Sequence, residues 1–163
     1  MAVTQATQGL EAPIPGDAAL RQFTGYAMKR ACLMVQDAVA DALAPLGLRI
    51  GTFSALGVVA GSPGISQSQL SDVLRIRRSG IVVVVDELQG AGLLERCPVP
   101  GDRRTYALTV TPEGEGRWRE AEAAVRAREA DILGRLAEDE IATLQDLLAR
   151  AERSAARGRG GKK

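Results

Sequence analysis

The chain has 163 residues, of which 45% are apolar and 25% are charged, as in an ordinary globular protein with one hydrophobic core. The net charge of +1 does not by itself indicate a nucleic-acid partner. Histidine is absent, which removes the commonest general base and metal ligand, so the composition argues against an enzyme.

The first segment, residues 1–16, is small, polar and proline-containing, and we expect a flexible extension. It lacks the positive and apolar regions of a signal peptide. No apolar run in the chain approaches the ~20 residues needed to cross a membrane. A cytoplasmic location and no membrane partner are therefore expected.

A long helix is predicted from Asp17, its cap, to about Leu43, where Pro45 and Gly47 end it. Apolar residues cover more than one face of this helix, so it must be buried on more than one face. In a small protein, this favours burial against both its own domain and a partner subunit. A shorter helix follows at about 52–60, with three apolar residues facing inward: Phe53, Leu56 and Val59.

The next helix is predicted from Ser66 to about Arg75. Ser66 and Gln69 have the spacing of a capping box, in which each side chain bonds the other residue's backbone N–H. The apolar residues of this helix fall on one face: Leu70, Val73 and Leu74.

Residues 78–89 are predicted to form a second short helix, ended by Gly90 and Gly92. The five β-branched residues at 81–85 also fit a buried strand, because each costs roughly 0.5 kcal/mol against Ala in a helix. Burying two of these side chains returns roughly 3 kcal/mol or more, and residues 86–89 continue the helical pattern. Helix is favoured, with a buried stripe of Ile81, Val84, Val85 and Leu88.

A β-hairpin is predicted after the second short helix. Residues 93–97 can extend, residues 98–102 contain two prolines and a glycine suited to a turn, and residues 105–110 have strand composition. The basic residues cluster at this hairpin tip and around Arg75 to Arg78, where a DNA footprint would need them.

Two long helices are predicted to close the chain. Thr111, Pro112 and Glu113 are a strong helix start, and this helix runs to about Leu136, with Glu122–Arg126 and Asp131–Arg135 as i, i+4 pairs. Its apolar line is Trp118, Ala121, Val125, Ile132 and Leu136. The last helix spans about 139–156. The sequence becomes basic and rich in glycine from about Arg153, and residues 157–163 are expected to form a disordered tail.

Residues from about Asp17 to Ala156 resemble the MarR family of bacterial transcription regulators. The likeness rests on VDELQGAGLLER (85–96), GDRRTYALTVTPEG (101–114) and the long helix on either side. The resemblance implies a mainly α fold with a small β-hairpin wing. A winged helix-turn-helix lobe would occupy residues 50–110, and residues 17–47 and 111–156 would form the dimerisation region.

The resemblance also implies contacts with double-stranded DNA, with the helix at 78–89 in the major groove. The sequence departs from the family pattern at two places that affect recognition of DNA bases. Val82 and Val83 occupy positions where Ser, Thr or Arg is usual, and Arg77 occupies the position where Ser or Asp usually caps the helix. The valines either touch thymine methyl groups or cover another surface. The implied DNA-binding residues are Ser66, Gln67, Arg75, Arg77, Arg78, Ser79, Gly80, Val82, Val83, Asp102, Arg103 and Arg104.

At the hairpin tip, the resemblance implies that Arg104 enters the minor groove, braced by Asp102 and with Arg103 alongside. Narrow A·T-rich minor grooves attract arginine through their deepened negative potential. The alternative is a solvated surface ion pair that contributes little.

The family likeness implies a homodimer through the terminal helices, against the alternative of a helical hairpin within one chain. The candidate dimer residues are Leu20, Phe23, Ile132, Leu136, Ile141, Leu144 and Leu148. The family likeness further implies a repressor without a cofactor, whose repression is relieved by a small aromatic or phenolic ligand. Tyr26 and Arg30 are candidate residues for binding this ligand.

Two other readings stay open. A winged-helix adaptor could use Val82 and Val83 to bind another protein. A redox-sensing regulator would use Cys32 or Cys97, which are far apart in sequence and form no zinc pattern; free cysteine is more often a small buried apolar residue.

Overall fold

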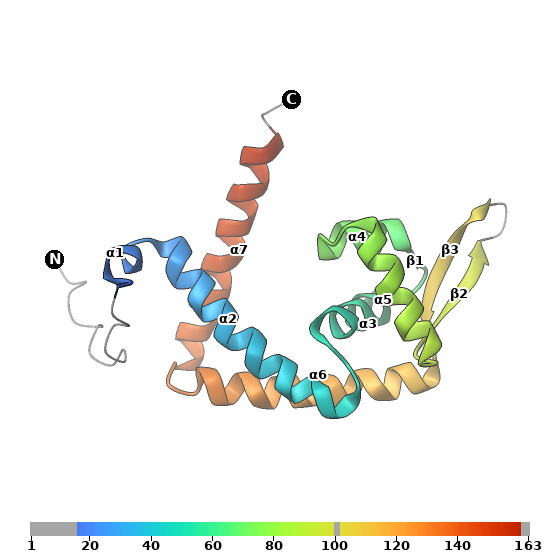
Figure 1. The fold of residues 1–163 in the computed structure, drawn as a ribbon, viewed down its shortest axis with the longest axis horizontal. Coiled ribbons are helices and arrows are strands. Elements are labelled where there is room, and N and C mark those ends of the chain that lie inside the picture. The colour runs from blue at the N-terminus through green and yellow to red at the C-terminus, as the bar shows by residue number, and fades with distance from the viewer. Residues whose placement is uncertain (1–15, 100–101, 161–163) are drawn as a thin grey trace. The chain divides into compact units, whose positions relative to one another are not determined.

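The structure is a computed structural model that describes residues 16–99 and 102–160 (Figure 1). It divides into two compact units, one ending at Asp37 and the other starting at Ala38, and each is described by itself. Helices dominate, and the strands form one small antiparallel sheet. The predicted fold class, mainly α with a small β-hairpin wing, is confirmed.

The first unit contains α1 (Ala18–Arg21) and the first part of α2 (Thr24–Leu43). The prediction of one continuous helix from Asp17 is wrong, because the chain leaves the helix at Gln22 and Phe23. Thr24 and Gly25, which open α2, are weak helix formers, so little is lost by interrupting the helix there. Asp17 precedes α1 but its side chain makes no capping hydrogen bond.

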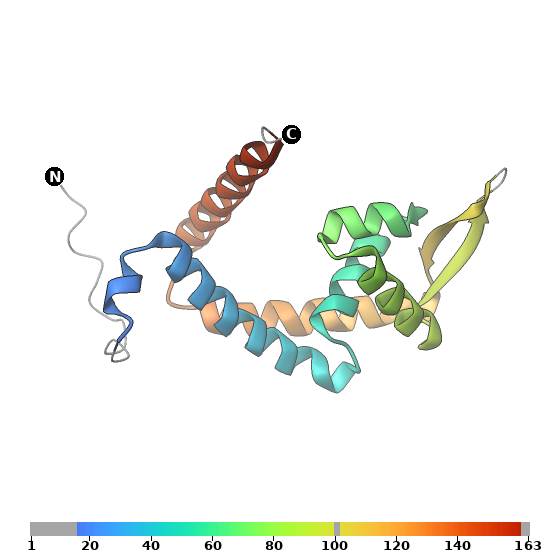
Figure 2. The ribbon, with the colours of Figure 1, turned by 45° about the horizontal axis from the view of Figure 1, so that its top comes forward.

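The core of the second unit is built by three short helices that lie beside the hairpin, as Figure 2 shows: α3 (Ile50–Gly61), α4 (Gln67–Leu74) and α5 (Arg78–Gly90). Isolated helices of this length are marginal in water, so their packing must stabilise them. Each of these helices, the strand β3 (Asp102–Val110) and the end of α2 supply fully buried side chains: Leu43, Leu56, Leu70, Ile81, Leu88 and Leu108.

Residues 81–85 are helical, so the prediction of a helix over a buried strand is confirmed. The stripe of Ile81, Val84, Val85 and Leu88 is buried as predicted. In α4, Leu70 is buried, but Val73, which shares its predicted apolar face, is 58% exposed. The helix has only eight residues and buries a narrow face centred on Leu70 and Ser71.

The sheet has the order β1-β3-β2, with all pairs antiparallel. The hairpin strands are β2 (Leu94–Val99) and β3 (Asp102–Val110), with Cys97 opposite Ala107, and the register shifts between Pro98 and Val99. Strand β3 begins three residues earlier than predicted. The edge strand β1 (Ile65–Ser66) has only two residues, too short to leave a pattern in the sequence.

Helix α6 (Pro112–Leu133) begins as predicted, since the Thr111 hydroxyl accepts a hydrogen bond from the Gly114 N–H at 3.0 Å. It ends at Leu133 rather than Leu136.

Helix α7 (Glu138–Gly160) continues beyond Ala156, so the expectation of a disordered tail is wrong up to Gly160. Residues 161–163 lie outside the described part of the structure. The helix continues because residues 153–156 include two alanines and an arginine, all strong helix formers.

Ion pairs on the outer face of α6 follow the prediction in part. Arg126 pairs with Glu122 as predicted, but Asp131 lies 3.8 Å from Arg128 rather than beside Arg135. The helix ends at Leu133, so Arg135 is no longer one helical turn from Asp131.

Within the described residues, no single helix is long and apolar enough to cross a membrane. Thr24–Leu46 and Ile50–Gly61 reach that length and composition only when they are taken together as a bent pair.

Candidate nucleic-acid interface

Hydrogen bonds fix both ends of α4, including the turn that leads from α4 to α5. The Ser66 hydroxyl accepts from the Gln69 N–H at 3.2 Å, and the Gln69 side chain accepts from the Ser66 N–H at 2.9 Å, which confirms the predicted capping box. At the other end, the buried Ser71 hydroxyl donates to the Ile76 carbonyl at 2.7 Å. The sequence analysis missed this role of Ser71, because a small polar residue next to Leu70 is the only sign of it in the sequence.

Arg75 ends α4 in the left-handed conformation, with φ of 53°. Among the described residues, it is the only one other than glycine with a positive φ. Its guanidinium lies 3.2 Å from the carboxylate of Glu152 on α7. Arg75 is therefore paired with a carboxylate, and Glu152 is a partner that the sequence pattern did not indicate.

Helix α5 separates an apolar buried face from an exposed face. Arg77, Arg78 and Ser79 are exposed at its start, and Val82 and Val83 follow with exposed fractions of 44% and 58%. No side chain caps the helix at Arg77, so the first N–H groups of α5 are available to an anion such as phosphate. In the described part of the chain, no carboxylate pairs with Arg77 or Arg78.

Gly80 serves the packing of this turn. A Cβ on Gly80 would lie 3.0 Å from the Ile76 side chain, so the glycine lets Ile76 fill the space under the start of α5. Ser66 and Gln67, at the start of α4, are half-buried.

Arginine side chains connect α5 to its neighbours. Arg96 on β2 pairs with Asp86 at 2.5 Å and donates to Gln89. Arg49, before α3, donates through Nε to Glu87 at 3.0 Å. This hydrogen bond is the main reason that the pKa of the Glu87 carboxyl lies below its usual range. The sequence analysis missed both arginines, because their carboxylate partners lie 10 and 38 residues away, which is not a helical spacing.

At the tip of the hairpin, Asp102, Arg103 and Arg104 belong to the start of β3. Their side chains lie outside the described part of the structure, so the predicted contacts of the wing stay predictions. The next exposed residue described on β3 is Tyr106, at 45%.

The candidate ligand residues Tyr26 and Arg30 converge on one carboxylate in the first unit. Asp17 accepts hydrogen bonds from the Tyr26 hydroxyl at 3.2 Å, from Arg30 at 3.1 Å and from Arg21 at 3.0 Å. The bond from Arg21 is the largest cause of a lowered pKa for Asp17, and burial opposes it. Asp17 is thus an anchor for these side chains, and Arg21 was missed as a member of the group.

Most of the candidate dimer residues are exposed in the single chain. Leu20 and Phe23 in the first unit are 46% and 58% exposed, and only Ile141 is half-buried. The remaining residues lie on or between α6 and α7 and are at least 36% exposed: Ile132, Leu136, Leu144 and Leu148. Leu147, 51% exposed, belongs to the same stripe of α7 and was missed.

The two cysteines are free, with Cys32 exposed and Cys97 half-buried. The exposure of Cys32 departs from the expectation that free cysteine is a small buried apolar residue. Within residues 16–99 and 102–160, no three metal-ligating side chains gather into a group.

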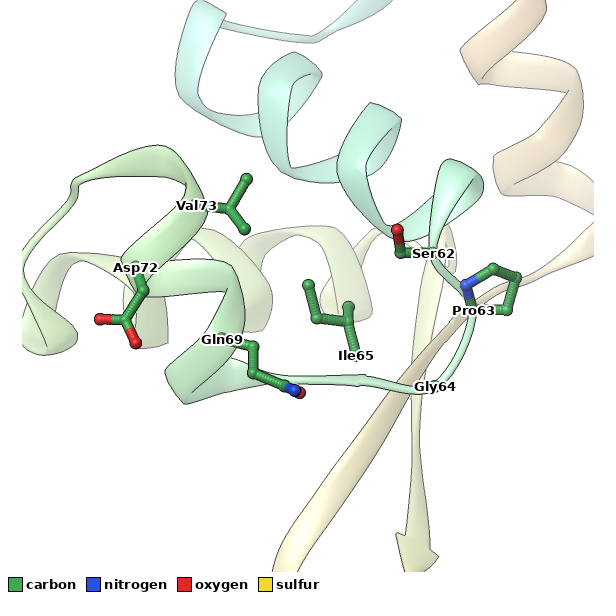
Figure 3. Close-up of a pocket in the computed structure, with 7 residues that line it drawn as sticks. All are labelled: Ser62, Pro63, Gly64, Ile65, Gln69, Asp72 and Val73. Atoms are coloured by element: carbon green, nitrogen blue, oxygen red, sulfur yellow. The ribbon is translucent and has the colours of Figure 1, made fainter. Parts of the chain in front are cut away.

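An open groove of about 540 Å³ lies between α4 and the loop at residues 62–65, and none of its lining residues belongs to α5 (Figure 3). Ile65 and Val73 point toward it, and Gln69 and Asp72 stand at its edge. Asp72 is its only charged lining residue, so the groove offers no cation to a phosphate.

This geometry defines a winged helix-turn-helix protein: α4, the turn at Arg75, α5 with one exposed face, and the β2–β3 hairpin. A sequence model described as the MarR family matches residues 46–105. The chain is 32% identical over 112 residues to the transcriptional repressor Rv2887 of Mycobacterium tuberculosis, covering 69% of this chain and 81% of that one. The chain belongs to the MarR family of transcription regulators.

A second relative is described as a transcriptional regulatory protein for the hcr operon of Thauera aromatica. It is 40% identical over 107 residues, and the match spans 66% of this chain and 64% of that protein. Members of this family are transcription regulators, not enzymes.

Solved structures of the family share the fold. The repressor CouR bound to a 23-mer DNA duplex has a TM-score of 0.79 at 31% identity, covering 87% of this chain and 99% of that chain. CouR from Rhodococcus jostii has also been solved with p-coumaroyl-CoA, at 32% identity, TM-score 0.71 and coverage of 80% and 92%. Rv2887 has been solved with p-aminosalicylic acid, at 28% identity, TM-score 0.67 and coverage of 80% and 98%.

Proposed function

We propose that this protein is a dimeric repressor that binds duplex DNA, and that a small aromatic ligand relieves the repression. The observation that carries the proposal is the division of α5 into a buried apolar face and an exposed face that begins with Arg77 and Arg78. These arginines are free of carboxylate partners within the described residues, so they are available to phosphates or guanine edges.

The major groove would receive the exposed face of α5. Arg78 and Ser79 supply polar groups, while Val82 and Val83 can contact only apolar base features such as the thymine methyl group. Arg104 would add a minor-groove contact from the wing. The selectivity of such a surface would rest on few base contacts and on DNA shape.

A homodimer would present two copies of α5 to half-sites one helical turn apart, roughly 34–36 Å. The exposed apolar residues of α6 and α7 support this assembly, since an apolar stripe on a helix is stable only when covered. A cytoplasmic location is part of the proposal, because the target is bacterial DNA.

The test is fluorescence anisotropy of the protein on DNA upstream of its own gene, against scrambled DNA, across a salt series. Specific binding should be roughly nanomolar and fall steeply with salt. Arg78→Ala should weaken binding by about tenfold and reduce the salt slope by about one if it contacts a phosphate. Arg126→Ala, on the exposed face of α6, is the matched control and should change neither quantity. Equal affinity for both DNAs at every salt concentration would contradict the proposal.

The second candidate function is a protein-binding adaptor, favoured by the exposure of Val82 and Val83. Arg104→Ala should cripple a DNA-binding protein, whereas Val83→Asp should be the more damaging change in an adaptor. Measuring both variants on DNA separates the two functions.

Ligand control would involve Tyr26 and Arg30 if an effector carboxylate replaces that of Asp17. The readout is a shift in melting temperature or operator affinity with added aromatic acids. Cys32 offers a redox alternative because it is exposed. If peroxide leaves DNA binding unchanged, the redox alternative fails.

A further inference from the structure

The β2–β3 hairpin leaves the hydrophobic core at Arg96. Leu94 on β2 and Leu108 on β3 are buried, and Arg96 lies opposite Leu108 in the antiparallel register. The residues of the next two pairs toward the tip are half-buried or exposed: Cys97 with Ala107, and Pro98 with Tyr106. Apolar packing therefore fixes the base of the wing, and the position of its outer part depends on other contacts.

Arg96 supplies such a contact between the wing and α5. Side chains two residues apart on a strand point to the same face, so Arg96 shares the face of the buried Leu94. Its guanidinium donates through Nη2 to Asp86 at 2.5 Å and through Nη1 to Gln89, and the side chain is only 21% exposed. Asp86 and Gln89 are three residues apart and are neighbours on the surface of α5. One planar guanidinium thus joins the strand to two acceptors on the helix, a fork geometry that lysine does not reproduce.

Asp86 belongs to the face of α5 that is proposed to enter the major groove. It follows Val82 by four residues and Val83 by three, so these side chains share one face of the helix. A free carboxylate on that face would repel phosphates, so neutralisation of Asp86 is a simpler role for Arg96. Neutralisation requires only a positive charge, whereas the mostly buried guanidinium also binds the uncharged Gln89. The second hydrogen bond favours a role in positioning.

We propose that Arg96 is a positioning residue that holds the wing at a fixed distance from α5 and thereby sets the DNA sequence preference of the protein. This role rests on the proposed function. A wing held in one place requires its minor-groove contact and the major-groove contacts of α5 to fall a fixed number of base pairs apart, which only some sequences satisfy. Attraction to phosphates does not depend on that distance. Loss of the contact should therefore lower sequence preference more than affinity for arbitrary DNA.

Fluorescence anisotropy of the full chain on the duplex upstream of its own gene and on scrambled DNA gives the sequence preference as the ratio of two dissociation constants. Arg96→Gln removes a positive charge and Asp86→Asn removes a negative one, so a purely electrostatic effect moves affinity for scrambled DNA in opposite directions. Both variants break the contact, and each should lower the preference about tenfold. Affinity for scrambled DNA should stay within about threefold of the parent. Arg96→Lys keeps the charge without the fork and should lower the preference about fivefold.

Two control variants separate this role from charge and from general stability. Arg126→Gln removes the same charge from an exposed ion pair on α6 and should leave the preference within about twofold of the parent. Glu87→Gln breaks the neighbouring ion pair on α5, which leads to Arg49 rather than to the wing, and should also stay within about twofold.

Amide hydrogen exchange of the free protein provides a readout without DNA. In Arg96→Gln, exchange should become faster in β2 and β3 and stay unchanged in α3, because the contact holds only the wing. A uniform increase over the whole lobe would mean that Arg96 stabilises the fold in general, which would overturn its role in positioning.

The DNA measurements separate this role from the proposed function. A parent that prefers the upstream duplex, with an Arg96→Gln variant of equal preference, would overturn the role of Arg96 and leave the proposed function intact. A preference lost in Arg96→Gln but kept in Asp86→Asn would also overturn it, since that pattern is the result expected from neutralisation alone. A parent without any preference would overturn the proposed function and, with it, a role for Arg96 in setting one.

Discussion

The winged-helix lobe and helix α7 differ in how they bury apolar side chains. In the lobe, Leu56, Leu70 and Leu108 have no exposed surface, and α3, α4, α5 and the sheet enclose them. In the described part of α7, no side chain is buried, and Leu144, Leu147 and Leu148 are 38%, 51% and 43% exposed. The lobe completes its own core, whereas α7 carries an apolar stripe that one chain leaves uncovered.

This difference indicates that the lobe stabilises the folded single chain, whereas α7 stabilises its assembly with another surface. Burial within the lobe contributes to folding of a single chain, at ~25 cal/mol per Å² of apolar surface. The stripe of α7 contributes only when another surface covers it, so its stabilising effect should depend on protein concentration. Substitutions in the two regions should therefore have different readouts.

The largest effect on folding is expected from Leu70→Ala in the lobe. The side chain is completely buried, so the cavity should cost about 2–5 kcal/mol of unfolding free energy. Val73→Ala in the same helix is the matched control, since Val73 is 58% exposed and should change stability by less than ~0.5 kcal/mol. Urea titration measures both, and equal losses would contradict the burial of Leu70.

The next effect is on assembly. Leu148→Asp puts a charge into the apolar stripe of α7 and should raise the dissociation constant of the dimer by about 30-fold or more, because an unpaired charge is costly to bury. Gln145→Asp adds the same charge to the same helix outside the leucine stripe and should change it little. Sedimentation equilibrium measures the dimer. A Leu148 variant that dimerises as well as the parent would show that α7 is not the interface.

A smaller effect on folding is expected at the junction between the hairpin and α6. A Cβ on Gly114 would lie 2.0 Å from the Leu93 carbonyl oxygen, so Gly114→Ala should cost about 2–3 kcal/mol by forcing the backbone apart. Gly116→Ala, two residues on, meets nothing within 4 Å and should instead gain up to about 1 kcal/mol of helix stability. Thermal melts should shift in opposite directions.

The smallest effect concerns the Arg49–Glu87 pair, which is half exposed and worth at most about 1 kcal/mol. The pKa of Glu87 is lower in the folded protein, so its contribution is present above the usual value of about 4.5 and lost as the pH falls through the folded value. Glu87→Gln should therefore be less stable than the parent at pH 7 and equal to it once Glu87 is protonated. A difference that persists unchanged in acid would exclude this ion pair as the cause.

Patterns of short range were sufficient to predict much of the lobe. The helical period placed Ile81, Val84, Val85 and Leu88 in the core, and the spacing of Ser66 and Gln69 predicted the start of α4, because both depend only on residues within two helical turns. The family resemblance added the order of the elements and the exposed face of α5. Val73 lies on the same apolar face of α4 as Leu70 and is nevertheless exposed, because periodicity does not determine how wide the buried part of a face is.

Other features were decided by tertiary structure alone. Arg49 meets Glu87 and Arg96 meets Asp86 across separations that carry no periodic signal. The hydrogen bonds from Tyr26 and Arg30 to Asp17 depend on the break between α1 and α2. The indole of Trp118 stacks on Phe53 and lies against Gly57, where a Cβ would be 2.6 Å from two indole carbons. The sequence by itself determined which segments are helices and which of their faces are apolar, since these follow from local spacing. Which distant side chains meet depends on how those faces pack, and only the three-dimensional structure sets that.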